Sequence, residues 1–158
     1  MRKLVGLALA IGVISSVATT SFAAEATDKT VKARRAYFQV VLSNAAPLFG
    51  MLKGKVAYDS AKAQTFANNL KLLIEMKNGH LWTKGSDNGN PELKGQTRAL
   101  PTIWEAGSDA GALSKSWKEA VVALAAEAGN GKEAMAARMK IVGEACSACH
   151  KKHRAKDF

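Results

Sequence analysis

Residues 146–150 read Cys146-Ser147-Ala148-Cys149-His150, and the position of this run decides the fold. Two cysteines separated by two residues and followed directly by a histidine form the attachment signature of a c-type haem. On a helix both cysteines lie near one face, where each thiol can add across one vinyl group of the same porphyrin. His150 projects to that side as well, so one imidazole nitrogen can bind the iron. The run therefore predicts one haem c, attached covalently through Cys146 and Cys149, with His150 as the metal ligand.

The N-terminal segment has the composition of a cleaved export signal. A basic start, Met1-Arg2-Lys3, precedes an apolar stretch over residues 4–13, and Ser21-Phe22-Ala23 places small residues where a signal peptidase reads them. The apolar stretch is short for a membrane anchor, and every later apolar stretch is interrupted by charges. We therefore predict a signal peptide over residues 1–23, no membrane span, and a mature domain over residues 24–158 in the periplasm.

The 158-residue chain has a formal net charge of +10, which falls to +8 when Arg2 and Lys3 leave with the signal peptide. A basic surface can bind nucleic acid, an anionic membrane or an acidic protein. The lysines are scattered along the chain, and an exported protein rarely meets nucleic acid. We therefore expect a solvated basic surface, no nucleic-acid partner and a single domain.

Other roles for the two cysteines agree less well with the sequence. A thioredoxin-like pair needs a strand–helix context, which is missing around Cys146. A zinc site that also used His150 and His153 would have ligands too close in sequence for a good tetrahedron. Two idle thiols are unusual in an exported chain, and a disulfide between Cys146 and Cys149 would close too small a loop to stabilise a fold.

Apolar residues recur at helical spacing in four segments, and the first two have recognisable boundaries. Asp28 is the predicted N-cap of the first helix, whose apolar stripe contains one arginine, Arg34. The second helix runs from about residue 59 to residue 77, and Gly79 lies just past its end as a stop signal.

The last two helices are separated by a tight break, Gly129-Asn130-Gly131, which makes them antiparallel neighbours. The third helix spans about residues 108–128. The fourth begins at Asn130, and Glu133 three positions later would complete a capping box. No strand pattern stands out. The predicted fold class is therefore all-α, an antiparallel up-down-up-down four-helix bundle with covalently bound haem.

Two segments depart from a plain bundle. Pro47 removes one backbone hydrogen bond and crowds the preceding turn, which predicts a kink or an early end of the first helix over residues 43–46. The stretch over residues 79–107 is rich in Gly, Asn and Pro, and a loop of that length is usually functional. An apolar anchor over residues 100–104, with room for a short helix, would let it cover a cofactor edge.

The remaining histidines and sulfur atoms are not predicted to bind iron. His80 follows a helix end, and His153 lies among basic residues, so both are expected in solvent. Four methionines at helical spacing are expected to pack in the core: Met51, Met76, Met135 and Met139.

The position of the haem motif is informative, because small soluble c-type cytochromes carry it near the N-terminus, whereas here it lies on the last of four helices. The chain resembles the cytochrome c′ family, the class II cytochromes c, which are up-down-up-down bundles. Three segments carry the resemblance: residues 146–154, with a basic residue four positions after the histidine, residues 97–104 before the third helix, and residues 32–38 in the first helix. The resemblance covers nearly the whole mature chain.

The resemblance implies roles for several residues around the cofactor. Arg34 would bind a haem propionate through its forked guanidinium, and Arg35, which stands where the family usually has glutamine, would make a second such contact. Gln96 and Thr97 match positions that touch the haem edge in the family. Arg154 would lie beside the proximal histidine.

The resemblance makes Phe38 the residue that sets the coordination state of the iron. Low-spin members of the class place a methionine there as the sixth ligand, whereas members with an apolar residue leave the iron five-coordinate. Phenylalanine cannot bind iron, and an apolar distal face offers bound dioxygen no hydrogen-bond donor. We therefore expect a high-spin haem that transfers electrons to a redox partner protein, binds nitric oxide or carbon monoxide, or does both. The structural alternative for Phe38 is a plain core aromatic.

Two other functions stay open at this point. One is a low-spin, six-coordinate electron shuttle of the same class. The other is a peroxidase-like enzyme, which would need a distal acid–base residue that Phe38 does not supply. The protein is therefore expected not to be an enzyme, with weak peroxidase activity left open. The resemblance also implies a possible homodimer through the first two helices.

Overall fold

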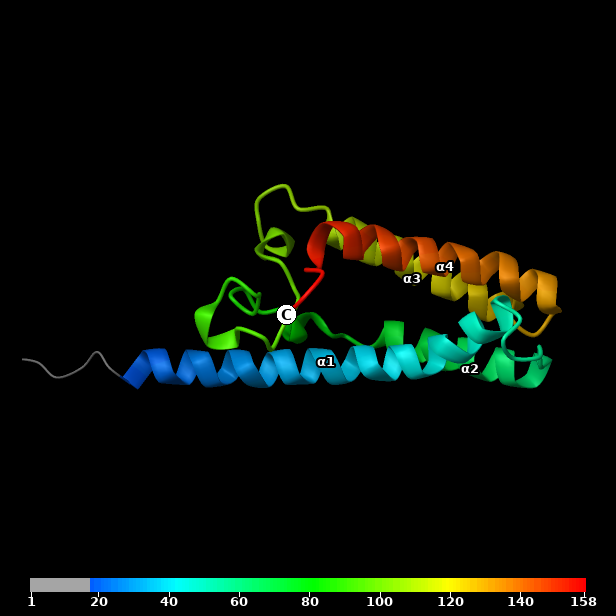
Figure 1. Cartoon of the computed structure of the whole chain (residues 1–158), viewed down its shortest axis with the longest axis horizontal. Helices are drawn as coiled ribbons and strands as arrows, with labels where there is room; N and C mark the ends of the chain where they lie inside the picture. Colours follow the sequence, from blue (N-terminus) through cyan, green and yellow to red (C-terminus); the bar gives the residue numbers. More distant parts are fainter. Residues whose placement is uncertain (1–17) are drawn as a thin grey trace, which may run out of the picture.

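A computed structural model describes residues 18–158, in which four long helices form one bundle (Figure 1). The helices are α1 (Ala18–Leu52), α2 (Ser60–Glu75), α3 (Ala110–Glu127) and α4 (Lys132–His153). Consecutive helices run in opposite directions, with α1 and α2 forming one layer and α3 and α4 the other. Contacts also join α2 to α3 and α4 to α1, so the bundle is closed. The predicted up-down-up-down fold is confirmed.

The predicted signal peptide falls largely outside the described part of the chain. Residues 1–17 are not described, and residues 18–23 belong to α1. None of the helices in the described part is both long and apolar enough to cross a membrane.

α1 is longer than the sequence predicted. Asp28, the predicted N-cap, lies inside the helix, and its carboxylate forms an ion pair with Lys32 one turn later at 2.7 Å. The helix also continues past Pro47 to Leu52, so an early end over residues 43–46 is wrong. Leu48, directly after the proline, is fully buried. Its burial in the core holds the turn that the missing hydrogen bond weakens.

The N-termini of the other helices show where local rules succeed and fail. The Asp59 carboxylate accepts a hydrogen bond from the amide of Lys62 at 2.9 Å and caps α2, which ends two residues before the predicted end. The capping box predicted at Asn130 is wrong, because α4 begins at Lys132 and its N-cap is Gly131. Gly131 has a φ of 124°, which glycine adopts readily, and the amide of Asn130 still donates to Glu127 in the turn that ends α3.

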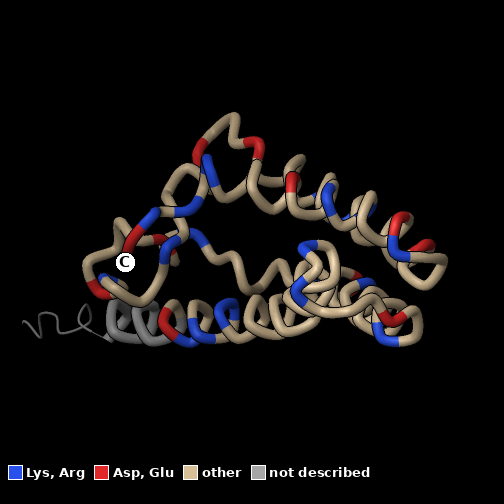
Figure 2. The backbone as a smooth tube through the Cα atoms, turned by 45° about the vertical axis from the view of Figure 1, so that its right-hand side comes forward, with Lys and Arg blue, Asp and Glu red and all other residues tan. Residues whose placement is uncertain are grey.

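The apolar core lies at the end of the bundle where α3 turns into α4. Along α1, the charged residues lie near its start, and none follows between Arg35 and Leu52 (Figure 2). The largest side chains of this core that are at most 2 % exposed are Leu48, Met51, Leu70, Val121, Leu124, Met135, Met139 and Val142, whereas Val31 and Leu93 are equally buried outside it. Three of the four methionines therefore pack in the core as predicted. Met76, at the C-cap of α2, is 42 % exposed, so that prediction is wrong.

The loop between α2 and α3 covers the opposite end of the bundle and is more structured than its composition suggests. It contains three short 3-10 helices, η1 (Gly79–Leu81), η2 (Pro91–Leu93) and η3 (Pro101–Ile103), the last of which confirms the expected short helix. Its second half pairs with the chain after α4: an isolated bridge joins Ala99 to Arg154, the only strand-like pairing within residues 18–158. The loop and the last turn of α4 therefore form one connected unit.

Candidate haem-binding site

The haem motif occupies the last two turns of α4, at the end of the bundle that the loop covers. Cys146 and Cys149 are free, and both are half-buried. Desolvation raises the pKa of both thiols, and the Asp109 carboxylate raises that of Cys149 further. Both thiols are therefore protonated near neutral pH.

His150 lies beside the thiols on an exposed part of the helix. Desolvation by the surrounding chain lowers its pKa, and the positive charges of Arg154 and Arg98 lower it further. The imidazole is therefore neutral near neutral pH, which is the form that binds a metal. Arg154 is exposed, and it acts on His150 through its charge.

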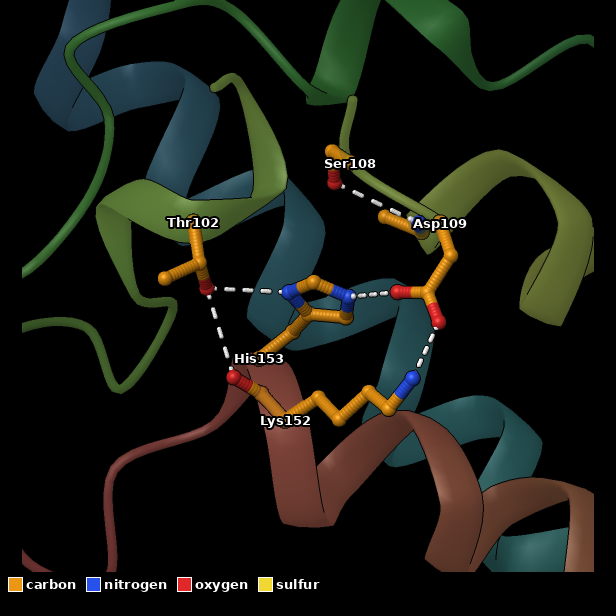
Figure 3. A network of polar contacts seen from close by, with 6 residues as sticks. Thr102, Ser108, Asp109, Lys152 and His153 are labelled. Carbon is orange, nitrogen blue, oxygen red and sulfur yellow. Dashed lines mark hydrogen bonds and ion pairs between the residues drawn. The ribbon is translucent and has the colours of Figure 1, made fainter. Parts of the chain in front are cut away.

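His153 is buried, 6 % exposed, so the prediction that it lies in solvent is wrong. The last turn of α4 directs its imidazole inward, between η3 and the start of α3 (Figure 3). Its two ring nitrogens contact Thr102 and Asp109 at 2.9 and 2.8 Å. These contacts remove His153 from any zinc site with the two cysteines. His80, in η1, is exposed as predicted.

Arg34 is buried, 4 % exposed, and it fastens the loop to α1. Its Nη1 donates to the Leu81 carbonyl at 3.1 Å and to Ser86 Oγ at 2.8 Å. Its Nη2 donates to the Ser86 carbonyl at 2.6 Å and to Thr97 Oγ1 at 3.0 Å. The guanidinium also lies over the Trp82 ring, 4.9 Å from its centroid. Because four of its five N–H donors bind the loop, a haem propionate would compete with loop contacts for this residue.

The other residues that the resemblance implicates lie in the same region. Arg35 Nη1 donates to the Gln96 carbonyl at 3.1 Å, next to the Thr97 hydroxyl that Arg34 binds. Arg35 also lies over the ring of Phe158, 5.4 Å from its centroid. The structure thus brings the two arginines of α1 together with Gln96 and Thr97 of the loop. Sequence reasoning missed Ser86, because no local signal shows that a loop serine accepts from an arginine 52 positions earlier.

Phe38 is 38 % exposed, so it is not a plain core aromatic. Its ring meets Trp82 edge-on, with centroids 6.0 Å apart, and it meets Tyr37 in the same manner at 5.1 Å. The Tyr37 hydroxyl donates to the Leu73 carbonyl at 3.0 Å and is occupied there. α1 therefore presents a partly exposed apolar ring that packs edge-on against Trp82 of the loop.

A match to a family model identifies the family of this chain. The model described as Cytochrome C' matches residues 29–154. The chain belongs to the cytochrome c′ family. A cytochrome c′ of Cereibacter sphaeroides is 33 % identical over 143 residues, which cover 90 % of this chain and 93 % of that protein. Cytochrome c-554 of the same organism is 29 % identical over 157 residues, covering 99 % of this chain and all of that protein.

Solved structures show the same cytochrome c′ fold. A cytochrome c′ from Rhodobacter sphaeroides superposes with a TM-score of 0.78 at 34 % identity, covering 82 % of this chain and 98 % of that one. The cofactor of the family is haem c. The residues present fit this group, because two protonated, half-buried thiols and a neutral imidazole lie within two helical turns of α4.

Proposed function

We propose that this chain is a periplasmic cytochrome c′ in which Cys146 and Cys149 hold one haem c through thioether bonds and His150 provides an axial iron ligand. The placement and protonation of the three side chains on α4 support this assignment. When bound, the haem supplies a one-electron redox centre and a coordination position for a small gas. Removal of residues 1–23 as a signal peptide would leave residues 24–158 as the mature haem domain.

The state proposed for the iron is five-coordinate and high-spin, with Phe38 over its distal face. The exposed ring of Phe38 is the single observation that carries this proposal, because phenylalanine has no atom that binds iron. Tyr37 beside it has its hydroxyl engaged with α2, and His153 has both ring nitrogens engaged. These groups therefore offer the distal face neither a ligand nor a hydrogen-bond donor.

An apolar distal face favours small ligands that bind without a hydrogen-bond donor. Bound dioxygen accumulates negative charge and needs a hydrogen-bond donor, whereas nitric oxide and carbon monoxide are small and bind without one. A nitric oxide complex has been solved for a variant of a cytochrome c′ with this fold, from Alcaligenes xylosoxidans. We therefore assign electron transfer with a redox partner protein, binding of nitric oxide or carbon monoxide, or both. Phe38 supplies no acid–base group, so peroxidase turnover is not the assigned function.

The absorption spectrum of the purified ferric protein, with and without nitric oxide, tests the assignment. A high-spin spectrum that changes when nitric oxide is added is expected. A low-spin spectrum with a methionine–iron band would contradict five-coordination. Phe38→Met should convert the protein to the low-spin form and reduce its nitric oxide binding, whereas Val40→Met, an exposed position on the same helix, should not.

A homodimer through α1 and α2 is the proposed assembly. These helices expose Val40, Leu42 and Leu72 at 48 %, 60 % and 66 %, and an apolar hollow that includes Val40 and Leu72 lies between them. One solved cytochrome c′ with this fold, 26 % identical, is described as a dimer whose dissociation is controlled by its ligand. Analytical ultracentrifugation should show a dimer for the wild type and a monomer for Leu72→Glu.

A further inference from the structure

A polar cluster around the buried imidazole of His153 fixes the last turn of α4 to the rest of the protein (Figure 3). The His153 imidazole lies between Thr102 Oγ1, 2.9 Å from Nδ1, and Asp109 Oδ1, 2.8 Å from Nε2. Thr102 Oγ1 is also 3.3 Å from the Lys152 carbonyl, and Lys152 Nζ donates to the other oxygen of Asp109. The cluster joins α4 to η3 and to the start of α3.

The acceptor groups of this cluster determine which of its nitrogen and oxygen atoms carry a hydrogen. Hydrogen bonds from Lys152 and His153 lower the pKa of Asp109, which is therefore ionised and can only accept. His153 Nε2 must then carry a hydrogen. The Thr102 hydroxyl either donates to a bare Nδ1, or accepts from a protonated Nδ1 and donates to the Lys152 carbonyl. Both ring nitrogens stay hydrogen-bonded in either case, so the imidazole is held in one place in both protonation states.

Asp109 bonds through its carboxylate to Lys152 and His153 and does not cap its own helix, α3. It is the N-cap residue of α3, where a carboxylate usually accepts from the free amides of its own helix. Its side chain makes no such bond, and the Ser108 hydroxyl accepts from the amide of Ala110 at 3.3 Å in its place. The carboxylate of Asp109 therefore points to α4, and a link between the two helices replaces an ordinary cap.

The turn held in this way carries the proposed iron ligand. Helix ends fray because their last carbonyls lack partners, and the amide of Arg154 closes the final hydrogen bond of α4 on the carbonyl of His150. The carbonyl of His153 accepts from the amide of Leu100 at 3.0 Å, which adds a contact between backbones. We infer that His153, clamped by Thr102 and Asp109, is a positioning residue that holds the imidazole of His150 in one orientation toward the iron. This inference rests on the proposed function of His150.

The iron–imidazole stretching band in the resonance Raman spectrum of the ferrous haem-loaded protein tests the inference. The band reports the bond from His150 itself, whereas a merely structural role would change stability and leave the band in place. His153→Phe keeps a planar aromatic ring at the position but removes both hydrogen bonds. Thr102→Val removes one of them at nearly constant shape, and Thr102→Ser restores the hydroxyl. We expect the band to shift and broaden in the first two variants and to return to its wild-type position in Thr102→Ser.

Lys152→Gln is the matched control, because it removes the exposed ion pair to Asp109 and leaves the imidazole clamp intact. Its band should coincide with that of the wild type. Should His153→Phe fail to mature, Thr102→Val alone decides. A wild-type band in Thr102→Val, even with a lower melting temperature, would overturn the positioning role. Absence of the band from the wild-type protein would instead overturn the proposed function of His150, and the inference with it.

Discussion

The two ends of the bundle are held together by different forces. At the end where α3 turns into α4, Leu48, Leu124 and Met135 are fully buried in an apolar core. The opposite end, here called the haem end because it carries residues 146–150, contains four buried polar residues, Arg34, Ser86, Thr97 and His153. Every buried polar side-chain atom in residues 27–158 has a hydrogen-bond partner. Apolar burial is strong and non-directional, whereas hydrogen bonds are directional. Apolar burial at the first end therefore stabilises the fold, whereas the directional hydrogen bonds at the haem end fix the positions of its side chains.

The largest effect on stability is expected in the apolar end. Leu124→Ala should lower the free energy of unfolding by about 3 kcal/mol, since it removes buried methyl groups and leaves a cavity. Urea denaturation measures the loss, and the spectrum of the folded protein should stay unchanged. Val122→Ala, at an exposed position of the same helix, should cost far less. A loss of stability equal to that of the control would break the distinction between the two ends.

At the haem end, Arg34→Met should destabilise by about 2 kcal/mol, because buried acceptors in the loop lose a charged donor. The effect should be local as well. Amide hydrogen exchange should accelerate at Ser86 and Thr97 and remain slow in α3. Arg35→Met, which removes a single exposed hydrogen bond, is the control. Unchanged exchange in the loop would show that Arg34 does not hold it.

A smaller effect is expected where a single cap supports the apolar end. Asp59→Ala removes the side-chain acceptor for the amide of Lys62 and should cost about 1 kcal/mol in a thermal unfolding measurement. Lys62→Met removes the neighbouring exposed ion pair but keeps the cap, and it should cost well under 1 kcal/mol. Equal losses in the two variants would assign the effect to charge and not to capping.

The smallest effect concerns acid stability at the haem end. The hydrogen bonds from Lys152 and then His153 hold the pKa of Asp109 below its ordinary value of 3.8. A carboxylate with a depressed pKa stabilises the fold above that ordinary value, and the contribution is lost as the pH falls through the folded-state pKa. Asp109→Asn should therefore be less stable than the wild type at pH 6, and the difference should shrink below pH 3.8. A constant difference at all pH values would exclude this origin.

The same contrast explains what the sequence could predict. Apolar periodicity and the break at Gly129-Asn130-Gly131 are local signals, and they located the bundle, its helix order and most of its core. The partners at the haem end are distant in sequence, because His153 meets Asp109 44 positions away and Arg34 meets Thr97 63 positions away. Local composition therefore placed His153 in solvent among its basic neighbours. The haem motif itself is contiguous, which is why its residues could be identified before the fold was known.

The pairing of the loop with the residues after α4 also limits when, during synthesis of the chain, the loop can be fastened. The amide of Ala155 donates to the Arg98 carbonyl at 2.8 Å, and Arg98 Nε donates back to the Ala155 carbonyl at the same distance. Ala155 is synthesised 57 residues after Arg98, so a growing chain cannot form this contact until residues 98–155 have all been made. Cys146 and Cys149 emerge shortly before that moment. The two thiols are therefore made while the loop is still unfastened, and only residues 150–154 separate their synthesis from that of the partner of the loop.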